Sequence, residues 1–427
     1  MLTQSSDREK VTISNYGKSI FAESEVCSVE YGGLPIGGGM SYGDSAISDK
    51  IALPVESFVE INPMKEVAIC SSGLTIEMLI RESIKHKLIP FVMPGTSKVT
   101  IGGAIASNIH GKSSFYYGYF CDHLTAITIR LTTGETVIAS RKKNSDLFHA
   151  TCGGMGSTGQ IIGAEIKLNK VEHTGFSEGR ISTPNLEATL KILDGSLNYV
   201  AWIDTSVSNI NKIGRGTVYY FIEGNNDVPL SFKSVDYPLS NRFKLINNIT
   251  GFLLSKIKYH IDRHLLPMHK YDLPIDSVQF PLDKINNWRN AYGKKGLYQF
   301  QGLFPEETAS YAISTALSTL KMMGHNPFLV SLKKTRQAET GNITFCGNGY
   351  ILAIDFSANE KSKEMILWLN EFVTKSGGKI YGAKDMFATK EQFIKMYSDG
   401  YCLQKKAISD MDKKINSRQL KRYGLVE

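Results

Sequence analysis

The sequence predicts an α+β fold, because short strands and helices alternate in its first part and longer strands follow. Two glycine-rich stretches, Leu34 to Asp44 and Pro90 to Lys112, fall within the first 170 residues. From about Lys170 the pattern changes to longer alternating runs such as LNYVAWIDTS and GRGTVYYFIEG, typical of a broad antiparallel sheet. The chain has 427 residues. Because a single core rarely exceeds about 250–300 residues, we expect two or three core units.

Composition and charge narrow the class of protein. With 42% hydrophobic and 21% charged residues, the chain is typical of a globular protein. The formal net charge of +8 favours an anionic partner: a phosphate-bearing substrate, acidic lipid headgroups or nucleic acid. No Lys/Arg block is interleaved with aromatic residues, so we expect no nucleic-acid partner.

The cysteines and the N-terminus indicate a cytoplasmic protein. The cysteines are scattered, with no C-x-x-C pair and no metal-ligand spacing, so we expect reduced thiols and no metal site. The N-terminus, MLTQSSDREK, is polar and lacks the apolar region of a secretory signal. The sequence has no uninterrupted apolar run of about 18 residues, the usual minimum for a membrane-spanning helix. The six cysteines are Cys27, Cys70, Cys121, Cys152, Cys346 and Cys402.

The early elements follow from periodicity. Asp49 to Cys70 supplies alternating segments that suit strands. Thr75 to Lys87 has apolar residues at helical spacing, with Thr75 or Ser72 as a plausible N-cap. This predicted helix leads the chain into the stretch that begins at Pro90.

The stretch PFVMPGTSKVTIGGAIASNIHGK, Pro90 to Lys112, has two glycine-bearing turns around a short β-rich run. Its glycines can take positive φ and approach a ligand closely, and its hydroxyl groups add donors beside outward-pointing N–H groups. Small residues would then let a flat group pack before His110. This indicates a dinucleotide-phosphate cradle, although a tight-turned β-meander without a ligand is the alternative from this stretch alone. The residues are Gly95, Gly102 and Gly103, Thr96, Ser97 and Thr100, and Ala104, Ala106 and Ser107.

The next segments predict a hairpin, a helix and a strand. Leu124 to Leu131 and Glu135 to Ser140 form a hairpin around Thr133-Gly134, Asp146 to Thr151 a short helix, and Gln160 to Leu168 a strand. Gly154 to Gly159 matches G-x-G-x-x-G, but a Rossmann fingerprint needs a strand before it and a helix after it. Here the order is reversed, so we expect no NAD site.

Three motifs in order carry a resemblance: LPIGGGMSYGD at Leu34 to Asp44, PGTSKVTIGGAIASNIHGK within Pro90 to Lys112, and DLFHATCGGMGSTG at Asp146 to Gly159. Together they resemble the PCMH-type FAD-binding domain of the vanillyl-alcohol-oxidase superfamily. WRNAYGKKGLYQFQGLFP at Trp288 to Pro305 and GGKIYGAKD at Gly377 to Asp385 extend the likeness over nearly the whole chain. They are similar to the decaprenylphosphoryl-β-D-ribose 2-oxidases, flavoenzymes of bacterial arabinofuranose biosynthesis.

The resemblance implies a two-lobed FAD-binding domain at 1–170, an antiparallel-sheet substrate (cap) domain with flanking helices at 171–375, and a C-terminal segment, 376–427, that returns to the flavin domain. Superfamily members usually place a β-α-β unit before the first glycine loop, whereas Tyr16 to Cys27 leaves little room for one. Either this first layer is trimmed or a strand near Val26 replaces it.

The resemblance also implies the cofactor site. Many sugar oxidases attach FAD covalently through a His in the first glycine loop, where this chain has Met40, so we expect non-covalent FAD. The implied cofactor-binding residues are Gly37, Gly38, Gly39, Met40, Ser41, Tyr42, Gly43, Asp44, Ser45, Gly95, Thr96, Thr100, Ile101, Gly102, Gly103, Ser107, Asn108, Ile109, His110, Gly156, Gly159, Ile162 and Tyr381.

Substrate contacts are implied for the C-terminal half. Gln299 and Gln301 alternate on a predicted strand, and paired amides suit sugar hydroxyls. Lys333 is a candidate for the substrate phosphate. Lys384, on a strand predicted from Lys379 to Lys384, is the candidate where cofactor and substrate meet, and His110 flanks the same face. The residues do not decide which of His110 and Lys384 is the base.

One position departs from the mycobacterial family members. They have Cys where this chain has Ala353, on the substrate side of the flavin. Ala353 keeps room for a sugar and removes a reactive thiol.

The implied activity is oxidation of a furanose secondary alcohol: FAD accepts a hydride from the carbinol carbon of a polyprenylphosphoryl-β-D-ribose, giving the 2-keto sugar. A separate NAD(P)H-dependent short-chain reductase would complete epimerisation to the arabinose derivative for cell-surface glycan synthesis. A sugar-alcohol or aldonolactone oxidase using oxygen, and a non-catalytic FAD-bound subunit, are the alternatives. The implied location is the bacterial cytoplasm.

Residues 240–270 are both apolar and basic. They predict either contact with the inner face of the plasma membrane or a loop and helix packed on the cap domain, since amphipathic stripes usually face a core.

Overall fold

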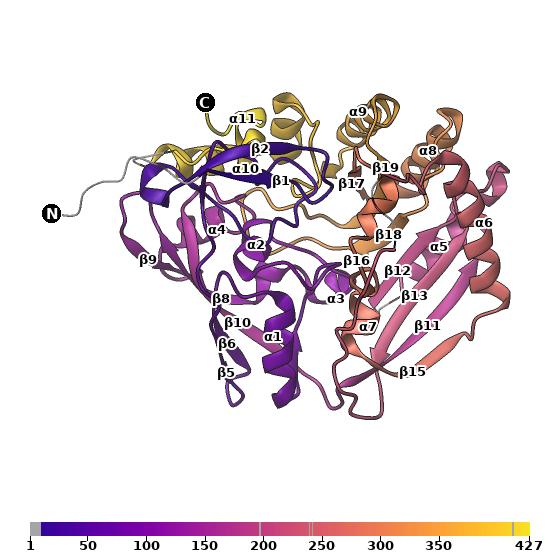
Figure 1. Cartoon of the computed structure of the whole chain (residues 1–427), viewed down its shortest axis with the longest axis horizontal. Helices are drawn as coiled ribbons and strands as arrows, with labels where there is room; N and C mark the ends of the chain where they lie inside the picture. Colours follow the sequence, from indigo (N-terminus) through magenta and orange to yellow (C-terminus); the bar gives the residue numbers. More distant parts are fainter. Residues whose placement is uncertain (1–9, 196–197, 239, 241, 412–413) are drawn as a thin grey trace.

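The computed structural model describes residues 10–195, 198–238, 240, 242–411 and 414–427. The elements up to β10 (Gln160–Lys170), called the first part of the chain below, lie on one side. The eight-stranded sheet, called the larger sheet, lies on the other, and the C-terminal helices return to the first part (Figure 1). The predicted α+β class is confirmed. Residues 1–9, which hold most of the segment in which we expect no secretory signal, lie outside the described residues. The domain boundaries at residues 170 and 375 stay a prediction.

The first part contains two small sheets. One has the order β1-β2-β4-β3, and the hairpin of β1 with β2 precedes the first glycine loop. The other has the order β5-β6-β10-β8-β9, with β7 also paired to β10. Their strands are β1 (Lys10–Ser14), β2 (Phe21–Val26), β3 (Leu34–Pro35), β4 (Lys50–Ala52), β5 (Val59–Asn62), β6 (Val67–Ser71), β7 (Leu88–Pro90), β8 (Leu124–Arg130), β9 (Thr136–Ala139) and β10 (Gln160–Lys170).

The helices of the first part are short. In α1 (Ile76–Ser83), the Thr75 side chain accepts a hydrogen bond from the Met78 N–H, as predicted for an N-cap. The short run predicted as β-rich between the two glycine turns has strand character only at one bridge between Thr75 and Thr100, and the second predicted turn, with Gly102 and Gly103, is instead part of α2 (Ile101–Ala106). The helix forms because the Thr100 hydroxyl caps the Gly103 N–H. The remaining helices are α3 (Ser114–Tyr117) and α4 (Ser145–Thr151).

The larger sheet has the order β15-β11-β13-β12-β18-β19-β17-β20. Alternate residues of its strands, such as Val218, Leu332 and Ile354, pack in one core with the helices α5, α8 and α9. On the opposite face, α6 lies over β11 and β13 (Figure 1). The elements are β11 (Gly175–Thr183), β12 (Asn198–Ile203), β13 (Gly216–Glu223), β15 (His269–Pro274), β17 (Leu297–Pro305), β18 (Val330–Thr335), β19 (Gly349–Ser357), β20 (Lys379–Ile380), α5 (Leu186–Leu193), α6 (Asn248–His264), α8 (Glu306–Met322) and α9 (Glu360–Lys375).

The C-terminal segment joins both parts. The strand predicted from Lys379 to Lys384 ends at Ile380, because the Lys384 N–H donates to the Tyr381 carbonyl and closes a turn. Beyond it, α10 (Lys390–Ser409) contacts α4, and α11 (Arg418–Arg422) follows. Further short elements are α7 (Ile275–Gln279) and the parallel pair β14 (Val235–Asp236) with β16 (Ile285–Asn286).

The apolar and basic segment forms α6 and its flanks, but its orientation differs from the core-facing one. The buried residues of α6 are Gly251, Ser255, Tyr259 and Asp262, so the apolar stripe faces outward. None of the helices in the described ranges is long and apolar enough to cross a bilayer.

Candidate functional site

A cavity of about 340 Å³ lies between the first part of the chain and the larger sheet. Both glycine loops line one side of it, and side chains from β17, β18, β19 and the turn after β20 line the other. This volume is in the range typical of ligand pockets. Sequence-predicted residues that line it are Gly37, Gly38, Gly39, Met40, Ser41, Tyr42, Ser45, Gly95, Thr96, Thr100, Gly103, Ser107, Ile109, His110, Gly156, Gln299, Gln301, Lys333, Tyr381 and Lys384.

The glycine-loop end presents unpaired backbone donors. The N–H groups of Gly37, Gly38, Gly39 and Met40 donate to no acceptor in the described part of the chain. The second loop adds the N–H groups of Gly95 and Thr96, which likewise lack an acceptor among the described residues. Successive free N–H groups that line one cavity form a nest suited to the oxygens of a phosphate.

Two kinds of glycine build this end. At Gly37, a Cβ would lie 2.3 Å from the Thr100 Oγ1, so this residue lets the two loops touch. At Gly39 and Gly95, a Cβ would meet nothing within 4 Å, which leaves open space beside the backbone. The first kind sets the shape of the cradle, and the second leaves room for its occupant.

Several predicted cofactor residues do not line the cavity, because they bond or pack against other parts of the chain. The Asp44 carboxylate accepts from Arg422, and the Asn108 side chain bonds Thr340, Thr344 and the Cys121 N–H. Each of the other five packs within the first part or against the C-terminal turn: Gly43 against Asp385, Ile101 in the core, Gly102 against Ser72, Gly159 against Arg130, and Ile162 in β10.

Ser97 is also engaged elsewhere. Its N–H and hydroxyl both donate to the Asp283 carboxylate, at 2.7 and 2.8 Å. Asp283 lines the cavity and comes from the segment after α7. Ser97, which the sequence offered as a hydroxyl donor to a ligand, therefore ties the second glycine loop to Asp283. Thr96 and Thr100 line the cavity.

At the opposite end, His110 meets Gln301. His110 is 6% exposed, and its Nε2 lies 2.8 Å from the Gln301 Nε2. Desolvation lowers the pKa of His110 well below 6.5, and Lys333 and Lys384 lower it further. The imidazole is therefore neutral, and its Nε2 accepts from the Gln301 amide. Its Nδ1 is buried with no partner among the described residues, so the ring has spare hydrogen-bonding capacity.

Lys384 lies over an aromatic ring at this end. Its Nζ is 3.9 Å from the ring centroid of Tyr42. Desolvation lowers the pKa of Lys384 to about 8, against the opposing effect of the Asp355 carboxylate. Desolvation raises the pKa of Asp355 to about 6, against the effects of Gln299, whose amide donates to it, and of Lys384. Lys384 can thus exist as ammonium or amine near neutral pH.

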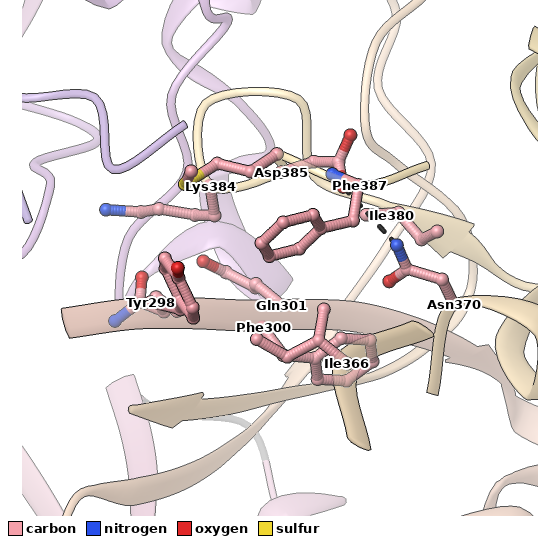
Figure 2. A pocket seen from close by; sticks show the side chains of 11 residues that line it. Tyr298, Phe300, Gln301, Ile366, Asn370, Ile380, Lys384, Asp385 and Phe387 are labelled. Atoms are coloured by element: carbon pink, nitrogen blue, oxygen red, sulfur yellow. Dashed lines mark hydrogen bonds between the residues drawn. The ribbon is translucent and has the colours of Figure 1, made fainter. Parts of the chain in front are cut away.

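The turn after β20 aims Lys384 into the cavity. Figure 2, a close view of a smaller adjoining pocket, shows Lys384 and Asp385 leaving this turn in different directions, above the strand that carries Tyr298 and Gln301. Asp385 is held on the far side by Arg422, at 2.6 Å, and by the Tyr423 hydroxyl, at 2.8 Å. Because Asp385 is anchored, the neighbouring Lys384 is directed at the site.

A second cationic group comes from β18. The Lys333 Nζ donates to the Gly111 carbonyl at 3.3 Å. Desolvation, together with the positive charges of Lys384 and Lys112, lowers the pKa of Lys333 to about 7. Three lysines within charge–charge range favour an anion between them, because an anion would relieve their mutual repulsion.

Sequence reasoning missed several residues of this end. Asp355 and Lys112 shape its charge, and Trp288 and Tyr16 line the cavity. Asp355 and Lys384 are far apart in sequence, so no local pattern pairs them. The alternation that predicted Gln299 and Gln301 on one face of a strand extends to Ala353, which is opposite Gln301 on β19 and also lines the cavity.

The G-x-G-x-x-G segment has the predicted context. Helix α4 precedes it and β10 follows it, the reverse of a Rossmann unit. Met155 and Gly156 line the cavity, and Tyr381 is in edge contact with His110, with ring centroids 5.0 Å apart. Ala106 and Ser107, the small residues after Thr100, line the same cavity as Met155 and Gly156, at the place where the resemblance implies a ring system.

The chain is similar to known flavoproteins. Residues 30–140 match the model of the FAD binding domain family. Over 409 residues, 90% of this chain and 88% of the relative, the chain is 28% identical to decaprenylphosphoryl-beta-D-ribose oxidase of Mycolicibacterium smegmatis. It is 27% identical over 278 residues to cytokinin dehydrogenase 9 of Oryza sativa subsp. japonica, covering 60% of this chain and 52% of the relative. It is 30% identical over 139 residues to D-lactate dehydrogenase of Archaeoglobus fulgidus, 31% of each chain.

The site fits the group that these similarities imply. The glycine loops offer free N–H donors for a pyrophosphate, and the other end offers His110 and Lys384 to a ring system. The predicted resemblance is confirmed: the chain has a PCMH-type FAD-binding domain and is an FAD-dependent oxidoreductase. Among the described residues, no group of three or more His, Cys, Asp or Glu side chains could hold a metal ion.

Proposed function

We propose that this FAD-dependent oxidoreductase, which acts on CH–OH groups, oxidises the 2′ hydroxyl of a polyprenylphosphoryl-β-D-ribose to the 2-keto sugar. One observation carries the proposal: a single cavity places Lys333, Lys384, Gln299 and Gln301 together, opposite the glycine loops. A substrate for this end needs both a negative charge and several hydroxyl groups, and a sugar phosphate ester has both. The mycobacterial relative that aligns over most of the chain carries such a substrate in its name.

We assign the phosphate to Lys333. Its pKa of about 7 means that much of it is uncharged near neutral pH in the free protein. A bound phosphate favours the ammonium form, so substrate binding is coupled to uptake of a proton by Lys333. Lys112, whose pKa desolvation lowers to about 8, adds positive charge beside it.

We assign the sugar hydroxyls to the two amides and His110. Gln301 is fixed by its contact with His110, and Gln299 by its hydrogen bond to Asp355. Each amide keeps part of its donor and acceptor capacity for a hydroxyl group. His110 lines the cavity, and its buried Nδ1–H has no partner in the part of the chain that the structure describes. Ala353 keeps the space opposite Gln301 open for the furanose.

We assign the hydroxyl proton to Lys384. An amine whose conjugate acid has a pKa of about 8 is a stronger base than an imidazole whose pKa is well below 6.5. Bound FAD supplies the two-electron acceptor for the carbinol hydrogen. Once protonated, Lys384 leaves a positive charge at this end, which stabilises negative charge developed during oxidation. Asp355 is a positioning residue, because it acts on Lys384 by charge and on Gln299 by a hydrogen bond.

The product would need a second enzyme. A 2-keto sugar becomes the arabinose epimer when a hydride is added to its opposite face, which is the chemistry of an NAD(P)H-dependent short-chain reductase. We propose such a reductase as the partner reaction in glycan synthesis. The absence of a Rossmann-type order around Gly154 to Gly159 supports a separate protein for this step.

The test is anaerobic reduction of the bound flavin. The visible flavin absorbance of the purified protein is followed while farnesylphosphoryl-β-D-ribose, a simple polyol or D-lactate is added. Bleaching by the phosphoryl sugar alone supports the proposal, and Lys333→Gln should then weaken binding of this substrate. Bleaching by polyols instead identifies a sugar-alcohol oxidase. Absence of bleaching with every substrate rejects the proposed activity while leaving the FAD-binding domain in place.

A further inference from the structure

Helix α6 is oriented with its apolar side chains outward. The stripe formed by Ile249, Leu253 and Ile257, spaced four residues apart, is 74%, 50% and 54% exposed. Apolar stripes of surface helices usually face a core. With its flanks, α6 forms what we name the α6 surface, whose exposed apolar side chains are Phe243, Leu245, Ile249, Leu253, Leu254, Ile257, Leu265, Leu266, Met268 and Tyr271.

The contacts of the buried face of α6 fix this orientation of the helix. A Cβ at Gly251 would lie 2.1 Å from the Asn326 carbonyl oxygen, so only glycine allows this close approach. The Ser255 hydroxyl lies 3.3 Å from that of Thr205, and the Tyr259 hydroxyl donates to the Thr183 carbonyl at 3.2 Å. Small and polar residues therefore hold the helix on the sheet, and rotation to bury the apolar stripe would break these contacts.

Two charged residues of α6 strengthen this attachment. The Lys258 Nζ bonds the Asp262 carboxylate at 2.5 Å and lies 4.8 Å from the ring centroid of Trp202. Arg180 of β11 is 3.7 Å from Asp262 and is buried. Asp262 is the only acidic residue between positions 242 and 271, and it is buried and paired.

All other charged side chains of the α6 surface between positions 242 and 271 are basic. Lys256 and Arg263 lie on α6, and Lys244 and Lys270 lie in its flanks; all four are exposed, as are His260 and His264. Lys256 and His260 are within three or four residues of Leu253 and Ile257, so cations border the apolar stripe. Exposed apolar residues bordered by cations, with a single exposed acid, Asp272, at the end of one flank, match a membrane interface with anionic lipids.

The α6 surface is connected to the cavity. Ile246, just before α6, packs in a cluster with Tyr42 and Trp288, which both line the cavity. The Ile246 N–H also donates to the Ala291 carbonyl at 2.8 Å. Contact of this surface with a bilayer would therefore bring the cavity close to the lipid phase.

We propose that the α6 surface docks the protein onto the surface of an anionic lipid bilayer, with the apolar stripe in the headgroup region and the bordering cations on lipid phosphates. Charge decides against a second copy of the chain as the occupant, because self-association would bring two basic surfaces together. This inference rests on α6 and its flanks and is independent of the substrate assigned above.

The test is flotation of the full-length, FAD-loaded protein with vesicles of phosphatidylglycerol and phosphatidylcholine, compared with phosphatidylcholine alone. We expect binding to anionic vesicles that weakens with salt. Substitution of Ile249, Leu253 and Ile257 by Ser should lower the bound fraction at least about tenfold, and Lys256→Gln with Arg263→Gln should lower vesicle affinity about fivefold per cation.

The matched control carries the same kind of change on α8. Tyr311→Ser with Met322→Ser removes side chains that are 75% and 85% exposed, and should leave vesicle binding unchanged. Flavin content and the unfolding transition of each variant show that it folds. The proposal is overturned if the wild-type protein does not float with anionic vesicles at low salt, if the α6 and control variants bind equally, or if the α6 variant instead abolishes a dimer seen in sedimentation.

Discussion

The two ends of the cavity are constructed differently. At the glycine-loop end, the free hydrogen-bonding groups are backbone N–H groups, and the residues that provide them are neighbours in the sequence. At the opposite end, which holds Lys333 and Lys384 and is called the lysine end below, side chains line the cavity, and they come from β17, β18, β19 and the turn after β20. The first end suits a group shared by many proteins, whereas the second can change its substrate by exchange of single side chains.

The ends are joined by one ion pair network, and breaking it should have the largest effect. Arg422 bonds Asp44, next to the first glycine loop, and Asp385, next to Lys384, each at 2.6 Å. Arg422→Met leaves two buried carboxylates unpaired, so we expect a loss of about 3–5 kcal/mol in the free energy of unfolding. Urea denaturation measures this loss.

The network also predicts a pH dependence. Despite desolvation, Arg422 and hydrogen bonds hold the pKa of Asp385 below 3.8. A depressed pKa stabilises the fold above the unfolded-state value and loses that effect as pH falls, so the difference between Arg422→Met and wild type should shrink in acid. Arg81→Met, which breaks an exposed pair with Glu77, is the control and should cost about 0.5 kcal/mol or less. Equal losses in both variants would contradict the assigned role.

Lys384 tests the chemistry of the lysine end alone. Lys384→Met keeps the length of the side chain but removes its charge and its proton acceptor. We expect kcat/KM to fall about 100- to 1,000-fold with flavin content retained, as for loss of a group that stabilises developing charge. Lys379→Met, five residues earlier on β20, should have little effect on the rate. A loss of flavin in Lys384→Met without a change in the rate per bound flavin would move Lys384 to cofactor binding.

Substitutions of Gly37 and Gly95 compare the two kinds of glycine at the glycine-loop end. Gly37→Ala places a Cβ 2.3 Å from the Thr100 Oγ1, so the loops must separate. We expect a loss of about 1–3 kcal/mol in stability and a lower FAD content after purification. Gly95→Ala adds a Cβ that meets nothing within 4 Å, so its stability should change by less than about 0.5 kcal/mol. Similar stability in the two variants would show that contact between the loops does not shape the cradle.

The smallest expected effect is a pH dependence of substrate affinity, which follows from the titration of Lys333. Only the ammonium form attracts the phosphate, and the pKa of Lys333 is about 7 in the free protein. The KM for the phosphoryl sugar should be constant below pH 7 and rise above it by at most about tenfold per pH unit. In Lys333→Arg the side chain stays charged, so the rise should disappear between pH 7 and 8. A KM that still rises there would assign the titration to another group.

The glycine-loop end could be predicted because its evidence is local. The motifs at Leu34 to Asp44 and Pro90 to Lys112 indicated a cradle, and the structure brings both into one cavity. Asp44 and Ser97 were predicted to contact the ligand, whereas in the structure their side chains bond other residues and do not line the cavity. A polar side chain beside a ligand and one that holds the loop look alike in sequence, and their partners, Arg422 and Asp283, are hundreds of residues away.

The lysine end could be predicted only in part. Alternation placed Gln299 and Gln301 on one face, but nothing local shows that Asp355 on the neighbouring strand bonds Gln299. The same limit applies to α6. Its periodicity predicted an amphipathic helix, whereas its orientation depends on Gly251, Ser255 and their distant partners.

The bond between Arg422 and Asp44 joins residues 378 positions apart. Ribosomes add about 5–20 residues per second, so the first glycine loop leaves the ribosome roughly 20–80 s before the residue that fixes it. The ion pair that ties the first glycine loop to the C-terminal segment can therefore form only after α11 has been synthesised, which makes this link a late step in the folding of the chain.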